Sequence, residues 1–199
     1  MICIHLTREQ LVACWVNGTK ACLGGESQLR EGQERLEKLT EDQFVGQIGH
    51  AAGSIWWSGS MDAYLQAREI ANAEPWKGDG GSDIQGVRID FKTSMMRKSQ
   101  DPSSYKLLVR PAERHKGCVY VLVLLPKFKV EELGQGLNVY IVGWAKEEDL
   151  PPHTETEGIF EGAYLLDSSR LRPVGAFYGK EIVESQCVAE DSSPVEHAF

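Results

Sequence analysis

The sequence of 199 residues lacks the features that mark membrane-spanning, secreted or disulfide-stabilised proteins. Its longest strongly apolar run, residues 119–126, is far shorter than the roughly 20 residues that a helix needs to cross a bilayer. The N-terminus has no basic region ahead of an apolar segment, so we expect no secretory signal. The five cysteines are an odd number and form no C-x-x-C pair, which favours reduced thiols in a cytoplasmic protein.

Several familiar site signatures are missing as well. The glycine-rich stretch 78–81 is not followed by the G-K-[ST] of a phosphate-binding loop. Most histidines are scattered without metal-ligand spacing, and no cysteine has the His and Asn partners of a nucleophile. With 42% hydrophobic and 25% charged residues, the composition is ordinary for a globular protein of this length, and one domain is expected.

The overall charge of −8 conceals a basic segment in the middle of the chain. Residues 92–116 contain seven Lys or Arg against two acids, whereas residues 147–199 contain twelve acids against three bases. The basic segment keeps a polyanionic partner open. The acidic C-terminal third offers a surface for a protein partner or for a second copy of the chain.

Hydrophobic periodicity predicts helices in the first part of the chain. Thr7 and Gln10 can form a capping box for a first helix, with Gly18 as its stop. Further helices are predicted over residues 41–57 and 61–73. The first of these carries three glycines, which are costly inside a helix and therefore favour close packing against a neighbouring backbone (Gly46, Gly49 and Gly53).

The pattern changes to strands after residue 81. Strands are predicted over residues 87–93, 105–109, 118–125, 138–145 and 162–166. Residues 118–125 are apolar without alternation, which is typical of a central strand buried on both faces. Helices followed by strands indicate an α/β core. We expect one domain over residues 1–188, with a helical extension at 1–39, a core at 40–175 and a mobile tail at 189–199.

The stretch most informative about chemistry is residues 78–94, GDGGSDIQGVRIDFKTS. Asp90 and Lys92 should share a face of their strand because side chains alternate with period two. A turn at residues 85–86 can fold Asp83 back beside them. Two neighbouring carboxylates repel unless a cation lies between them, and Mg²⁺ prefers such oxygen ligands. The alternative is a surface alternation without a site, which D-x-K spacing usually represents.

These residues make the sequence resemble the PD-(D/E)XK nuclease superfamily, which has the restriction-endonuclease-like fold. Asp83 matches the first acid, with Ser82 in place of the proline, and the D-F-K of residues 90–92 matches the (D/E)-x-K element. The segment FVGQIGHAA resembles a G-Q-x-G-E-x-A helix pattern, with Gln47 retained and His50 where Glu is expected. The resemblance covers residues 40–175. It implies a central mixed β-sheet flanked by helices, in a bacterial or phage protein.

The resemblance also implies a metal-dependent deoxyribonuclease. One or two Mg²⁺ or Mn²⁺ ions would be bound by Asp83, Asp90 and the carbonyl of Phe91. The helix residue that joins them is left open between Gln47, His50 and neither. Lys92 would orient or activate the attacking water. DNA phosphates would meet the basic run, unless it is only a solvated loop (Arg97, Lys98, Lys106, Arg110, Arg114 and Lys116).

Two other functions are consistent with the same sequence. The departure at His50 and the overall acidity favour a module that binds nucleic acid or inhibits a protein without catalysis. The acidic C-terminal third favours a protein-interaction component. Trp56 and Trp57 can stack on bases, but a pair of aromatics at a helix end more often closes a core.

Overall fold

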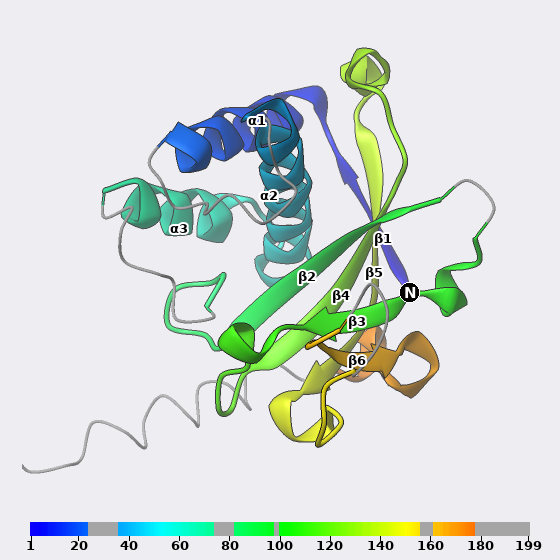
Figure 1. The fold of residues 1–199 in the computed structure, drawn as a ribbon. Coiled ribbons are helices and arrows are strands. Elements are labelled where there is room, and N and C mark those ends of the chain that lie inside the picture. The colour runs from blue at the N-terminus through cyan, green and yellow to red at the C-terminus, as the bar shows by residue number, and fades with distance from the viewer. Residues whose placement is uncertain (24–35, 74–81, 98–99, 156–160, 178–199) are drawn as a thin grey trace, which may run out of the picture.

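The structure is a computed structural model that describes residues 1–23, 36–73, 82–97, 100–155 and 161–177 (Figure 1). Its helices are α1 (Arg8–Leu23), α2 (Leu36–Ser58) and α3 (Asp62–Ala73). Its larger sheet contains β1 (Ile2–Leu6), β2 (Ile89–Met96), β4 (Val119–Pro126), β5 (Leu137–Lys146) and the short β7 (Arg172–Pro173). A smaller sheet pairs β3 (Lys106–Val109) with β6 (Tyr164–Asp167).

The larger sheet is mixed, and the predicted α/β class is confirmed. Its strands follow the order β1-β5-β4-β2, with β7 added beside β5. β2 runs parallel to β4, whereas the other pairs are antiparallel. Within the described part of the chain, β2 is therefore an edge strand and β4 lies inside the sheet. Residues 119–125 of β4 are all buried, which confirms the prediction of a strand covered on both faces.

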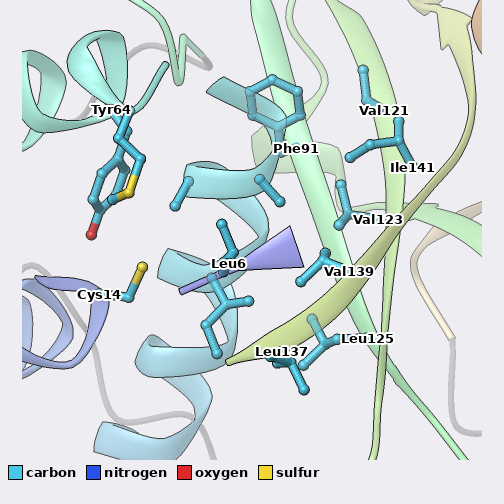
Figure 2. Packing of buried hydrophobic residues seen from close by; sticks show 14 of the residues in the cluster. Leu6, Cys14, Tyr64, Phe91, Val121, Val123, Leu125, Leu137, Val139 and Ile141 are labelled. Atoms are coloured by element: carbon cyan, nitrogen blue, oxygen red, sulfur yellow. The ribbon is translucent and has the colours of Figure 1, made fainter. Parts of the chain in front are cut away.

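The two faces of the sheet pack against different layers. In Figure 1 the three helices lie together on one side of the larger sheet, and β3 and β6 lie on the other. Figure 2 shows Phe91, Val121 and Val139 on the helical side, in the core that also contains Tyr64. Alternate residues of β4, such as Tyr120 and Leu122, belong instead to the core beneath β3 and β6. Side chains at even positions of β2 therefore face the smaller sheet.

Helix α2 approaches β2 closely because it carries glycine at the points of contact. A Cβ atom at Gly49 would lie 1.8 Å from Thr93 Oγ1, and one at Gly53 would lie 2.4 Å from the Phe91 ring. Close packing occurs at these two glycines, but against side chains of β2, so the predicted contact with a neighbouring backbone is wrong there. It is also wrong at Gly46, where a Cβ would meet nothing within 4 Å.

The N-terminal part of the chain departs from the sequence prediction in two ways. The capping box is confirmed, because the Thr7 N–H donates to Gln10 Oε1 (2.8 Å) and the Gln10 N–H to Thr7 Oγ1 (3.4 Å). Gly18 does not end the helix, since α1 continues to Leu23. A Cβ at Gly18 would lie 3.2 Å from the backbone nitrogen of Phe44, so this glycine lets α2 pack closely.

The second departure is β1, which was not predicted and which makes residues 2–6 part of the sheet. Residues 24–35 of the predicted helical extension, and the predicted tail at 189–199, lie outside the described residues. None of the helices that the structure describes combines the length and apolarity needed to cross a membrane.

Candidate active site

A tight turn brings Asp83 to the open edge of β2, as the sequence predicts. Ile84 and Val87 form an isolated antiparallel bridge around a turn in which Gly86 adopts a φ of 75°. This left-handed conformation suits glycine, which has no Cβ. The Asp83 N–H donates to the carbonyl of Ile89 (2.8 Å), and Asp83 Oδ2 accepts the N–H of Phe91 (2.6 Å). The Asp83 carboxylate is thereby anchored beside the strand that carries Asp90.

Asp90 and Lys92 lie on the same face of β2, as their spacing predicts. Lys92 Nζ is 2.8 Å from Asp90 Oδ2 and 3.0 Å from Glu113 Oε2. All three side chains are largely buried, with exposed fractions of 18% for Lys92, 13% for Asp90 and 31% for Glu113. The ammonium group thus bridges two carboxylates next to the Asp83 anchor.

Glu113 is the residue of this cluster that the sequence analysis missed. It closes the 3-10 turn η2 (Pro111–Glu113), which leads from β3 towards the start of β4. Because β2 and β4 are parallel, their first residues lie at the same end of the sheet, where Asp90 is level with Tyr120. The only local signal is Pro111, which favours a turn. The contact between Glu113 and Lys92 depends on the strand order.

The three ionisable groups of the cluster differ in how their surroundings shift their pKa values. Burial, together with the nearby Asp83 carboxylate, raises the pKa of Asp90 to about 7 despite the opposing effect of Lys92. Burial alone would lower the pKa of Lys92, but the Asp90 and Glu113 carboxylates outweigh it, and the net change is upward. Burial opposes ionisation of Glu113 as well, yet Lys92 and Arg110 lower its pKa overall. At neutral pH, Lys92 is therefore an ammonium, whereas the raised pKa of Asp90 makes this acid easier to protonate than an ordinary aspartate.

His50 reaches the cluster from the helical side of the sheet. Its Nε2 donates to the backbone carbonyl of Asp83, and its Nδ1 lies 3.6 Å from Asp83 Oδ1. The ring also packs edge-on against Tyr64, with centroids 5.0 Å apart. Because a carbonyl can only accept, Nε2 carries the proton. His50 thus holds the backbone carbonyl of Asp83, and its ring lies beside the Asp83 carboxylate.

The structure does not bring Gln47 into the cluster. Gln47 Oε1 accepts the hydroxyl of Tyr64 (3.0 Å) within the helical layer, and the residue is 6% exposed. Trp56 and Trp57 pack around Phe177, with ring centroids 5.0 and 5.6 Å away, as expected for aromatics that close a core.

Most of the predicted basic residues are exposed, and several of them also form ion pairs. Arg97 and Lys116 are exposed, and Arg110 extends beside Glu113, with Nη1 3.4 Å from Oε1. Lys106 is exposed and lies 3.4 Å from Asp167. Arg114, in contrast, forms a 2.6 Å ion pair with Glu147 and stacks over Tyr164. It therefore has a structural role that the sequence did not indicate. Lys98 lies outside the described residues.

Asp83, Asp90 and the Phe91 carbonyl offer oxygen atoms of the kind that could hold a magnesium ion. Among the described residues, no group of three or more His, Cys, Asp or Glu side chains is assembled to hold a metal. Magnesium does not require one, because it commonly binds through one or two carboxylates and keeps several waters. Asp83 and Asp90 supply two carboxylates whose mutual repulsion contributes to the raised Asp90 pKa. The Phe91 carbonyl faces the same edge, since the N–H and C=O of one strand residue point to the same side.

Comparison of the chain with protein-family models, with curated proteins and with solved structures gives no match. The functional interpretation therefore rests on the geometry of this cluster.

Proposed function

We propose that this chain is a metal-dependent nuclease that hydrolyses phosphodiester bonds in DNA, and that its core is of the restriction-endonuclease-like type. The observation that carries the proposal is the convergence of Asp83, Asp90 and Lys92 at one end of an edge strand. This is the arrangement that the D-x-K resemblance implies. Its position at an open sheet edge supports access by a nucleic-acid backbone.

The chain would hold a Mg²⁺ or Mn²⁺ ion through Asp83, Asp90 and the Phe91 carbonyl. Such an ion, when bound, lowers the pKa of a coordinated water and stabilises the leaving oxygen. We assign His50 a positioning role, because its Nε2 donates to the backbone carbonyl of Asp83. Gln47 has no part in this proposal, since its side chain belongs to the helical layer.

Lys92 acts in this proposal as a cation rather than as a base. Its pKa is raised, so at neutral pH it has a proton to donate in hydrogen bonds and no lone pair to accept one. It orients the attacking water and stabilises negative charge on the phosphorus-bound oxygens. Asp90 would hold the ion as a carboxylate, and because its pKa is raised in the absence of metal, loading the site at lower pH would displace a proton.

The exposed basic residues supply the contacts to DNA phosphates in this proposal. Arg110 is joined to the cluster through its contact with Glu113. Arg97, Lys106 and Lys116 would add contacts that are independent of base sequence. Each phosphate neutralised makes affinity more sensitive to salt, by a slope of about −0.9 per contact on duplex DNA.

Cleavage of single- and double-stranded DNA with Mg²⁺ or Mn²⁺ tests the proposal. Wild type should cut, and Asp90→Ala and Lys92→Ala should lose at least about a hundredfold in rate. Asp149→Asn, which alters a carboxylate paired with Arg172, should retain activity. Equal activity in wild type and both cluster variants would refute the assignment. Tight DNA binding without cleavage or metal dependence would favour an inactive binding module instead.

A further inference from the structure

Glu113 forms ion pairs with two cationic side chains. Its Oε2 atom lies 3.0 Å from Lys92 Nζ, and its Oε1 atom lies 3.4 Å from Arg110 Nη1. Oε2 also accepts the backbone N–H of Arg110 (3.2 Å). One carboxylate thus connects the ammonium group of the cluster to an exposed guanidinium group.

The backbone of Glu113 is fixed by the sheet beneath it. The hydroxyl of Tyr120 donates to the Glu113 carbonyl (2.9 Å) and accepts the N–H of His115 (2.8 Å). Tyr120 is completely buried in the middle layer of the protein. Glu113 is therefore held in place by a rigid neighbour, which is the usual requirement for a residue that orients another group.

Lys92 forms ion pairs with two carboxylates, and only one of them, Asp90, is a proposed metal ligand. Asp90 holds the ammonium at 2.8 Å, but the same carboxylate would be drawn to a divalent ion. Glu113 forms the second ion pair of Lys92, at 3.0 Å. It can keep Lys92 in place when the charge of Asp90 is shared with metal.

We propose, resting on the function proposed above, that Glu113 is a positioning residue for the reaction. It holds Lys92 beside the reacting phosphate while Asp90 binds metal, and it aligns Arg110 with the same phosphate. Lys92 and Arg110 then act as one cationic pair on a single phosphate group. This role accounts for a largely buried glutamate that is shared between two cations at the end of a short turn.

Glu113→Gln tests this role, because it removes the charge and nearly preserves the shape. We expect kcat to fall about 10–100-fold with KM for DNA changed by less than about threefold, as is typical for residues that orient a catalytic group. Mn²⁺ affinity, measured by calorimetry without DNA, should fall about 3–10-fold, because Lys92 then depends on Asp90 alone and competes with the ion. Glu113→Asp, which keeps the charge, should recover part of both losses.

Glu147→Gln is the matched control. Glu147 is also partly buried and pairs with an arginine at 2.6 Å, but its partner, Arg114, is stacked on Tyr164 rather than placed in the cluster. This variant should leave kcat and Mn²⁺ affinity within about twofold of wild type. Circular dichroism and urea unfolding of every variant would identify any loss that arises from misfolding.

The outcomes separate this inference from the proposed function. If wild type cleaves DNA but Glu113→Gln has wild-type kcat and Mn²⁺ affinity, or if Glu147→Gln loses as much, the role of Glu113 is refuted and the nuclease assignment stands. If wild type neither cleaves DNA nor binds Mn²⁺ through Asp90, the proposed function fails, and the role of Glu113 fails with it.

Discussion

Replacement of Asp90 by asparagine is expected to stabilise the metal-free protein at pH 8. Asp90 is buried, and burial together with the nearby Asp83 carboxylate raises its pKa from the ordinary value of 3.8 to about 7. Between pH 3.8 and about pH 7, Asp90 therefore keeps its proton in the folded state, whereas it has released that proton in the unfolded chain. At about 1.4 kcal/mol per pH unit, ionising Asp90 in the folded state costs up to roughly 4 kcal/mol. Asparagine has the size of the protonated acid and removes this cost.

The sign of the effect defines the pH window. For a carboxyl whose folded pKa is raised, stability is full below about pH 4 and falls as the pH rises towards 7. The gain from Asp90→Asn should thus be near zero at pH 4 and reach about 2–4 kcal/mol at pH 8. Asp149 should behave in the opposite way. Although burial opposes its ionisation, its bond to Arg172 lowers its pKa overall, so Asp149→Asn should destabilise the protein at pH 8.

Urea unfolding in the presence of EDTA, at pH values from 4 to 8, measures both differences. The midpoint and the slope together give the free energy of unfolding for each variant. Addition of Mn²⁺ at pH 8 should then stabilise wild type and leave Asp90→Asn unchanged. An Asp90→Asn protein that is less stable than wild type at pH 8 would show that ionised Asp90 is a net stabiliser, and the electrostatic reasoning would be wrong.

Three further predictions concern the packing around the cluster. Gly49→Ala should lower the free energy of unfolding by about 1–3 kcal/mol, because its Cβ would overlap Thr93. Gly46→Ala should raise it by up to about 1 kcal/mol, since a Cβ there meets nothing. Equal urea midpoints for the two variants would contradict the described contact of α2 with β2. Thr93→Val should raise the free energy of unfolding by about 1 kcal/mol, since Thr93 Oγ1 is buried without a hydrogen-bond partner among the described residues. A loss of stability would instead indicate that the hydroxyl forms a hydrogen bond. Tyr120→Phe should lower the free energy of unfolding by about 1–3 kcal/mol and should also lower the cleavage rate, because the Glu113 backbone loses its hydrogen bond to Tyr120. A wild-type stability together with a wild-type cleavage rate would show that the turn is held by other contacts.

Local sequence patterns were sufficient for those parts of the site that lie within one turn or one strand. Period-two alternation placed Asp90 and Lys92 on one face, and the Gln-Gly pair at 85–86 placed Asp83 beside them. These features need only the residues between positions 83 and 92, so no knowledge of the rest of the fold is required. The buried β4 was predictable for the same reason, because residues 119–125 leave no polar face.

Contacts between distant segments could not be predicted in this way. Glu113 meets Lys92 only because the parallel pairing of β2 and β4 brings η2 to the start of β2. Gln47 and His50 are three residues apart on one helix, yet only His50 reaches Asp83, because the relative positions of α2 and α3 direct Gln47 to Tyr64. Gly18 reads locally as a helix stop, but its role is to admit the backbone of Phe44. The pairing of Arg114 with Glu147 is likewise fixed by the tertiary arrangement.

The proposed function requires that Asp83 and Asp90 together hold a divalent cation. Titration calorimetry with Mn²⁺ at pH 8, in the absence of DNA, tests it most directly. Wild type and Asp149→Asn should bind Mn²⁺ with the same affinity, and both Asp83→Ala and Asp90→Asn should abolish binding. No heat of binding in wild type, or unchanged binding in Asp83→Ala, would contradict the account.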